Sequence, residues 1–142
     1  MKRYPMRFLV VASVILTIFL ASCNGGAGSK SGSSRKPNVY VLPANKSLDN
    51  AVSDKKMSVV SFTLPGNRIC GTADSTFKLA SARFPDVQFI SVDVNLHQDL
   101  IENLKIEAIP AVLVIHKSGQ KDWHIGPMTA DELDFAIKDA QE

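Results

Sequence analysis

The sequence predicts an α/β fold in which a mixed central sheet is flanked by helices on both faces. Short apolar segments with a strand pattern alternate with segments whose apolar residues recur every three to four positions. Two apolar segments near the C-terminus are joined by Lys117-Ser-Gly-Gln120, a turn sequence typical of a hairpin. A helical segment follows that hairpin. This order of strands and helices predicts one sheet covered on both faces.

The first half of the predicted domain, residues 38–142, contains two strands and two helices. Residues 38–42 form a short strand that Pro43 ends, and Ser47 is placed to cap a short helix. Residues 58–64 form the second strand. The segment 68–84 is predicted to be helical because its apolar residues recur on one helical face. These residues are Ala73, Phe77, Ala80 and Phe84.

The next strand and helix follow at once. Residues 87–94 are rich in β-branched side chains and predict a buried strand. Asn95 is placed to cap the helix after it. The predicted inner face of that helix consists of Leu96, Leu100, Ile101 and Leu104.

The C-terminal part predicts a hairpin and a last helix. Residues 111–116 and 121–125 are the two strands of the hairpin. Thr129 and Glu132 have the spacing of a capping box, Thr-x-x-Glu, which opens the last helix. The apolar residues of this helix are Leu133, Phe135, Ala136, Ile137 and Ala140.

Residues 1–22 have the pattern of a secretory signal peptide. Lys2, Arg3 and Arg7 precede an uncharged apolar stretch, residues 8–21. Its 14 residues are short for a membrane span, which needs about 20. The stretch ends in Leu20-Ala21-Ser22-Cys23, which resembles the lipobox of bacterial lipoproteins.

The lipobox resemblance implies cleavage before Cys23 and a diacylglyceryl group on its thiol. We therefore expect a protein held by lipid in the bacterial cell envelope, facing outside the cytoplasm, on the periplasmic side in a Gram-negative cell. Residues 23–37 are rich in glycine and serine and predict a flexible linker between the lipid and the domain. The alternative is an uncleaved apolar anchor in which Cys23 is incidental.

Net charge argues against nucleic-acid binding. The chain has 16 Lys and Arg against 14 Asp and Glu, but three of the basic residues lie in residues 1–22, which contain no acid. The remainder has 13 basic and 14 acidic residues, a net charge of −1. Because no basic stripe with interleaved aromatics follows the linker, we expect no nucleic-acid partner.

The order of motifs from Val59 to the C-terminus resembles the thioredoxin family. The segment 84–94 is similar to the family's third strand with its lead-in, and Ile109-Pro110 to its proline loop. The final hairpin and Gly126 match the family's hairpin and the glycine before its last helix. The resemblance implies a thioredoxin-like fold and an oxidoreductase ancestry. It also implies that the Ile109-Pro110 bond is cis.

The active-site segment departs from the family pattern of two cysteines separated by two residues. In the favoured register, Asn67-Arg-Ile-Cys70 occupies that motif, so Asn67 stands in place of the attacking cysteine and Cys70 in place of the second. Ser61 replaces the buried acid of the family. Asn67 cannot attack a disulfide, but asparagine is a good N-cap. Cys70 is the candidate catalytic thiol, one turn inside the helix.

A rival register places the helix start later. Gly71 would interrupt the helix, Thr72 would cap a start at Ala73, and Cys70 would stand just before the helix. That arrangement would give an exposed single thiol. It needs a three-residue insertion before the helix and an equal deletion within it.

The candidate site therefore consists of Cys70, Asn67, Ile109 and Pro110. Thiol–disulfide exchange needs an attacking thiolate and a second thiol that resolves the mixed disulfide. With one active-site cysteine, we expect at most a single-cysteine, oxidoreductase-like activity, with the dithiol cycle weak or lost. The alternative is a redox-inactive module that binds a protein or peptide at the Cys70/Pro110 face.

We expect no metal and no cofactor. The histidines His97, His116 and His124 have no metal-ligand spacing with each other or with Cys70. His116 is expected to be structural or at the surface, and Trp123 to pack on the last hairpin or to join a binding face.

Overall fold

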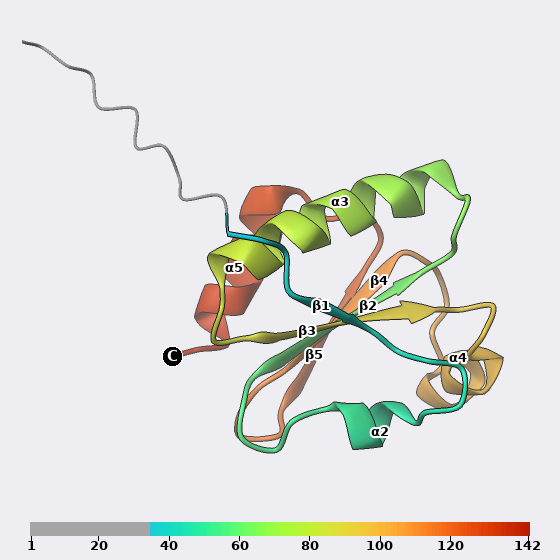
Figure 1. Cartoon of the computed structure of the whole chain (residues 1–142), viewed down its shortest axis with the longest axis horizontal. Helices are drawn as coiled ribbons and strands as arrows, with labels where there is room; N and C mark the ends of the chain where they lie inside the picture. Colours follow the sequence, from blue (N-terminus) through green and yellow to red (C-terminus); the bar gives the residue numbers. More distant parts are fainter. Residues whose placement is uncertain (1–34) are drawn as a thin grey trace, which may run out of the picture. The chain divides into compact units, whose positions relative to one another are not determined.

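A computed structural model describes residues 35–142 as a mixed sheet of five strands, in the order β1-β3-β2-β4-β5 (Figure 1). The predicted signal peptide, Cys23 and most of the predicted linker lie outside the described residues. The strands are β1 (Val39–Val41), β2 (Ser58–Thr63), β3 (Gln88–Asp93), β4 (Ala111–Ile115) and β5 (Lys121–Ile125). The helices of the described part are α2 (Leu48–Ala51), α3 (Arg68–Arg83), α4 (Gln98–Leu104) and α5 (Ala130–Asp139).

The sheet is mixed, as predicted. β3 pairs in parallel with both β1 and β2, whereas β4 is antiparallel to β2 and β5 is antiparallel to β4. Helix α3 is the crossover between the parallel neighbours β2 and β3, and α2 lies in the connection from β1 to β2, which flank β3. The register sets Ser61 of β2 opposite Ser91 of β3, and Phe62 opposite Ala111 of β4.

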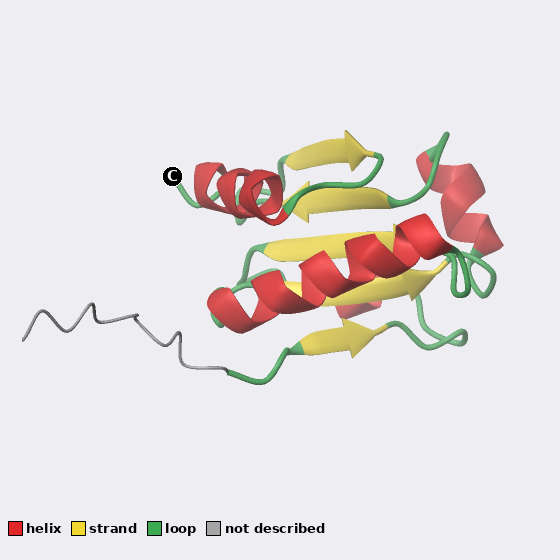
Figure 2. Cartoon of the chain, turned by 90° about the horizontal axis from the view of Figure 1, so that it is seen from above, coloured by secondary structure: helices red, strands yellow, loops and turns green. Residues whose placement is uncertain are grey.

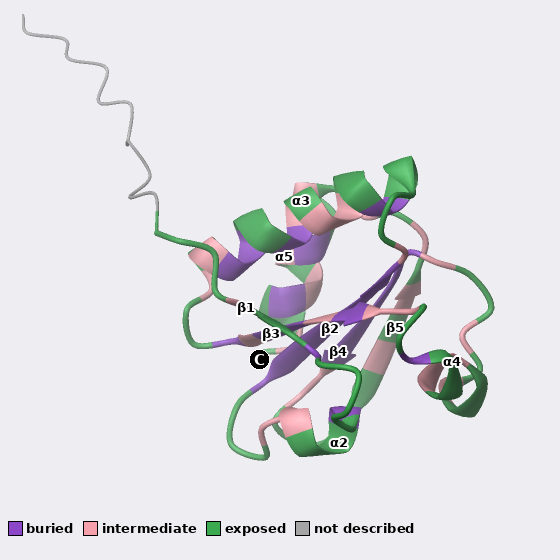
Figure 3. Cartoon of the chain, turned by 45° about the vertical axis from the view of Figure 1, so that its right-hand side comes forward, coloured by how far each residue is buried: buried purple, intermediate pink, exposed green. Residues whose placement is uncertain are grey.

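Helices cover both faces of the sheet and enclose two cores. Helices α3 and α5 pack over one face, and α2 and α4 over the other (Figure 2). Successive residues of a strand point to opposite faces, so Val59 joins the first core and Val60 the second. All six residues of β2 are buried, which marks β2 as the centre of the fold (Figure 3).

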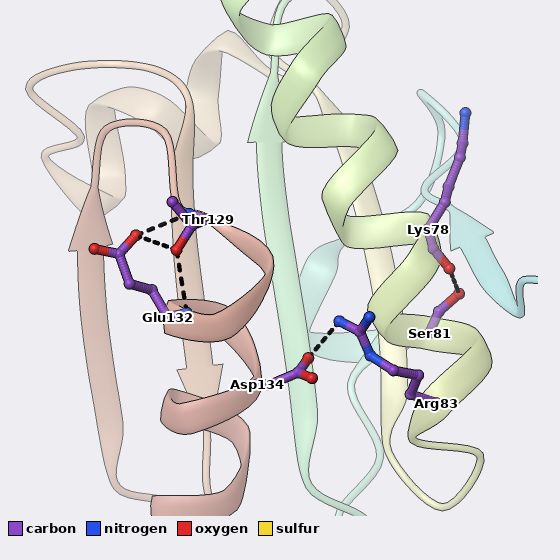
Figure 4. Close-up of polar contacts among 6 residues, drawn as sticks. All are labelled: Lys78, Ser81, Arg83, Thr129, Glu132 and Asp134. Carbon is purple, nitrogen blue, oxygen red and sulfur yellow. Dashed lines mark hydrogen bonds and ion pairs between the residues drawn. The ribbon is translucent and has the colours of Figure 1, made fainter. Parts of the chain in front are cut away.

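Helix α3 buries the predicted face. Phe77 and Ala80 are fully buried, and the Phe77 ring meets Phe89 edge-on with centroids 5.1 Å apart. At the C-terminal end of α3, Arg83 forms an ion pair of 2.6 Å with Asp134 of α5 (Figure 4). This contact joins the two helices that cover one face of the sheet.

Helix α4 begins later than predicted, at Gln98. The side-chain Oδ1 of Asp93 accepts a hydrogen bond of 2.9 Å from the Asn95 N–H. The backbone carbonyl of Asp93 accepts one of 3.1 Å from the Leu96 N–H. These bonds form a turn after β3, so Asn95 does not cap the helix. His97 is the N-cap residue instead, and Leu96 is 54% exposed rather than on the inner face.

The predicted capping box of α5 is confirmed. Thr129 Oγ1 accepts a bond of 3.3 Å from the Glu132 N–H, and Glu132 Oε2 accepts one of 2.8 Å from the Thr129 N–H (Figure 4). The hydrogen bonds from the backbone and side chain of Thr129 hold the pKa of Glu132 below its ordinary value.

Candidate functional site

A tight turn carries the chain from β2 into α3. The Asn67 N–H donates to the Leu64 carbonyl at 3.2 Å, and Gly66 between them has a φ of +83°. Proline at the second position of a turn and glycine with positive φ at the third are typical of a type II turn. Pro65 and Gly66 thus fix the place at which Asn67 starts the helix.

Asn67 is the N-cap of α3. Its Oδ1 accepts hydrogen bonds from the Ile69 N–H at 2.9 Å and the Cys70 N–H at 3.2 Å. Its carbonyl accepts the first intrahelical bond, from the Gly71 N–H at 2.9 Å. Helix α3 therefore begins where the favoured register places its start.

The rival register is wrong. The helix is already under way at Arg68, and Thr72 Oγ1 donates back to the Arg68 carbonyl at 3.3 Å as an interior residue does. Asn67, and not Thr72, caps the helix. It follows the Pro65-Gly66 turn, its backbone is extended as an N-cap requires, and asparagine is a strong N-cap residue.

Cys70 lies in the first turn of α3 and is a free, buried thiol with 1% exposure. Buried free cysteines behave mainly as small apolar side chains. Reactive cysteines are at least partly exposed. In this conformation the environment of Cys70 is that of a packing residue.

A groove of about 510 Å³ runs beside Cys70, between α3 and the edge formed by β1 and β3. Its polar side chains include Thr63, Ser91 and Asp93 from the strands, and the Asp74–Lys78 ion pair of 2.6 Å on α3. Sequence reasoning missed this groove. The available signal was the pair of polar residues Ser91 and Asp93 at alternate positions near the end of β3, because alternate residues share a face of the sheet.

Ser61, which the family resemblance places at the position of a buried acid, carries a neutral hydroxyl. It is 1% exposed, and its Oγ has no hydrogen-bond partner among residues 35–142. A serine hydroxyl does not exchange protons near neutral pH as a carboxyl does. No buried carboxyl is therefore available at this position to move protons.

The Ile109-Pro110 peptide bond is cis, as the family resemblance implied. Pro110 is buried just before β4, and its carbonyl accepts a hydrogen bond of 2.8 Å from the Gly126 N–H. Because Ala111 pairs with Phe62, the proline loop reaches the same end of the sheet as the turn before α3.

The proline loop and the thiol line different hollows. Ile109 borders a hollow of about 460 Å³ that is closed by Leu64 and α4. Cys70 borders the groove on the α3 side, and Leu64 contributes to both. Asn67 and Cys70 are thus brought together by the helix start, while Ile109 faces a separate hollow of mixed apolar and polar lining.

The remaining side chains singled out in the sequence have structural contacts. Trp123 stacks on Phe62 with ring centroids 5.8 Å apart. His97 is buried with Nε2 3.3 Å from the Leu42 carbonyl oxygen, and His116 Nε2 lies 2.5 Å from Asp122. Within residues 35–142, no three His, Cys, Asp or Glu side chains gather as a metal site would require. None of the described helices is long and apolar enough to cross a membrane.

The strand order, the helices on both faces and the cis proline beside a helix-starting turn define a thioredoxin-fold protein. Comparison with known proteins agrees, because residues 39–139 match the sequence profile of the Thioredoxin family. The chain therefore belongs to the thioredoxin family.

Relatives and solved structures agree with this assignment. A thioredoxin of Mycoplasma genitalium is 30% identical over 88 residues, which are 62% of this chain and 86% of that protein. An H-type thioredoxin of Fagopyrum esculentum is 30% identical over 89 residues, 63% of this chain and 76% of the relative. The crystal structure of thioredoxin from Malassezia sympodialis superposes with a TM-score of 0.65 at 22% identity, covering 76% of this chain and 95% of that one.

Proposed function

We propose that this thioredoxin-family protein is a lipid-anchored module of the bacterial cell envelope in which the dithiol cycle is lost. In this proposal, the end of the sheet near Asn67 and Pro110 binds a protein or peptide partner. One observation carries the proposal: Asn67 caps α3 with two hydrogen bonds while Cys70, the only thiol of the described residues, is 1% exposed.

The loss of the cycle follows from its chemistry. An attacking thiolate must cleave the substrate disulfide and form a mixed disulfide, which a second thiol then cleaves to release the reduced substrate. Asn67 has no sulfur for the first step. Cys70 is shielded from solvent and would need an outside thiol for the second.

Apolar surface near Pro110 supports the binding role. The hollow beside Ile109 is lined by aliphatic side chains of the turn, the loop and α4, including Leu64, Ile101 and Ile106. Ile69 in the first turn of α3 is 55% exposed. Apolar groups left in water at a hollow are typical of sites that receive a partner.

Membrane anchoring rests on the sequence alone. The basic start, the short apolar stretch and the Leu20-Ala21-Ser22-Cys23 motif support cleavage and lipid attachment at Cys23. In this proposal Cys23 is consumed by the lipid and does not serve as the missing thiol.

Turnover of a disulfide substrate tests the loss of the cycle. With excess dithiothreitol and insulin as substrate, the full chain should reduce insulin no faster than dithiothreitol alone. Asn67→Cys should raise the rate, because it places a thiol at the start of α3 three residues before Cys70. Asn67→Ser is the matched control, since it keeps a capping oxygen without adding a thiol.

The outcome against the proposal is specific. Turnover by the unaltered chain that disappears in Cys70→Ala, with thermal unfolding of both proteins still cooperative, would show that Cys70 alone supports catalysis.

A second candidate function is single-thiol chemistry at Cys70, and the groove of about 510 Å³ beside this residue favours it. Alkylation by iodoacetamide separates the two functions. The binding module predicts that Cys70 of the folded chain reacts only at the rate of unfolding, whereas single-thiol chemistry predicts fast reaction without denaturant. The Cys70→Ala variant, treated in the same way, gives the background of alkylation at residues other than Cys70.

A further inference from the structure

Phe135 is an exposed aromatic residue on the outer side of α5. It is 71% exposed, although the sequence pattern counts it among the apolar residues of that helix. Asp131 lies four residues before it and Asp139 four residues after it. Residues four apart share one helical face and are separated by about 6 Å along the axis. The helix thus presents a stripe of acid, aromatic and acid.

This stripe borders a groove of about 970 Å³ between α5 and β5. Figure 2 shows α5, the helix that ends at the marked C-terminus, alongside the last two strands. The apolar side chains of its lining are Pro127, Met128, Phe135 and Ala136. Trp123 and Ile125 also border the groove, but alternation along β5 turns their side chains to the opposite face, where Trp123 stacks on Phe62 of the second core. Phe135, at 71% exposure, is therefore the large apolar side chain that faces water here.

The groove has an acidic rim. Among the described residues, its lining includes the carboxylates of Asp122, Asp131, Glu132 and Asp139 and neither lysine nor arginine. Glu132 is used in the capping box, and hydrogen bonds from His116 and then Gln120 hold the pKa of Asp122 below its ordinary value. Asp131 and Asp139 form no ion pair within residues 35–142. These two carboxylates are available to a cationic partner.

The strand beside the groove favours a partner in an extended conformation. β5 is the last strand in the sheet order, so one edge of its backbone is unpaired among the described strands. Three consecutive residues, Trp123 to Ile125, line the groove, which therefore runs along that strand. An extended peptide beside an edge strand adds main-chain hydrogen bonds to its side-chain contacts.

The spacing of the acidic stripe also matches an extended peptide. Alternate residues of a strand are about 6.6 Å apart on one face, close to the separation of about 6 Å between Asp131, Phe135 and Asp139 along α5. We propose that the α5–β5 groove binds an extended peptide segment of the form basic-x-apolar-x-basic. The two basic side chains pair with Asp131 and Asp139, and the apolar side chain between them covers Phe135. This site is distinct from the one in the proposed function.

Anisotropy of a fluorescent dye on the peptide gives a direct readout of binding. The experiment titrates the dye-labelled peptide Ser-Lys-Thr-Leu-Thr-Lys-Ser with the purified full chain. We expect a saturable rise in anisotropy that weakens with added salt. The peptide Ser-Glu-Thr-Leu-Thr-Glu-Ser, of opposite charge and equal length, should give no saturable change.

Variants assign the response to the groove. Asp131→Asn and Asp139→Asn should each weaken binding about two- to fivefold, as expected for a partly exposed ion pair. Phe135→Ser should weaken it further, whereas Asp54→Asn, which changes an exposed acid in a turn elsewhere, should leave it unchanged. Thermal unfolding of each variant checks that α5 is intact.

Three results would overturn the proposal. The first is no saturable change with the basic peptide. The second is binding that the Asp131 and Asp139 changes do not weaken, which would place the peptide elsewhere. The third is a concentration-dependent dimer in sedimentation that Phe135→Ser abolishes, because a second copy of the chain would then be what covers the groove.

Discussion

Two neighbouring residues, Gly66 and Asn67, decide how the candidate site begins. Gly66 supplies the positive φ of the turn after Pro65, and Asn67 takes up the helix N–H groups that lack an intrahelical partner. Both roles are local and can be recognised in the sequence. The same two hydrogen bonds occupy the Asn67 side chain, at the position where the predicted register places the family's attacking thiol.

Substitution of two glycines tests the conformational role of Gly66. Gly66→Ala should lower the free energy of unfolding by about 1 kcal/mol, since the left-handed region is strained for residues with a Cβ. Gly71→Ala should instead raise it by about 0.5–1 kcal/mol, because Gly71 lies inside α3, where alanine is favoured. A Cβ at either position meets nothing within 4 Å, so the contrast isolates the backbone term.

Urea denaturation of the two variants measures this contrast. Equal effects of the same sign would contradict the assignment of a left-handed conformation to Gly66 and a helical one to Gly71.

The start of a helix was predictable where one local pattern decides it, and it was missed where two local patterns compete for the same residue. The start of α5 follows from Thr129 and Glu132 alone. The start of α4 does not, because Asp93 at the end of β3 captures the Asn95 N–H and delays the helix to Gln98. Sequence reasoning gave Asn95 the cap because it considered that residue's propensity without its competing partner.

In the candidate site and on α5, the features that were missed depend on distant contacts. Asn67 and the cis Ile109-Pro110 bond were expected from the sequence and its family resemblance. The Ser61 hydroxyl is buried without a hydrogen-bond partner among residues 35–142 because β2 lies between β3 and β4. The exposure of Phe135 depends on which face of α5 packs on the sheet. Neither is encoded in a short segment.

At the scale of an element, the capping box makes α5 sensitive to acid. Because the folded-state pKa of Glu132 lies below its ordinary value, its contribution to stability is present at neutral pH. It is lost as the pH falls through that lowered folded-state value. Glu132→Gln should therefore lower the urea midpoint at pH 7, and the difference from the unaltered chain should shrink towards pH 3.

Asp54→Asn is the control, because it removes an exposed carboxylate outside any helix. A Glu132→Gln difference that stays constant from pH 7 to pH 3 would mean that the shape of the side chain, and not its charge, stabilises α5.

At the scale of the whole molecule, the two proposals concern opposite edges of the sheet. The chain enters the domain at β1, one edge of the sheet, while the acidic groove lies at β5, the other edge. Four strand spacings of about 4.8 Å separate these edges. A partner bound at β5 therefore meets the domain on the edge away from the point where the proposed tether begins.

The anchor itself is testable with the two cysteines as a matched pair. In a bacterial host, the unaltered chain should partition into detergent with the mass of a cleaved, diacylglyceryl-bearing protein. Cys23→Ser should lose the lipid mass, because the acceptor thiol is missing, whereas Cys70→Ala should keep it. Phase partition and intact mass measure both. An unaltered chain that is uncleaved and partitions into detergent without lipid mass would show that the apolar stretch of residues 8–21 is itself the anchor. The domain would then be held by an uncleaved segment, as in the alternative that the short stretch argues against.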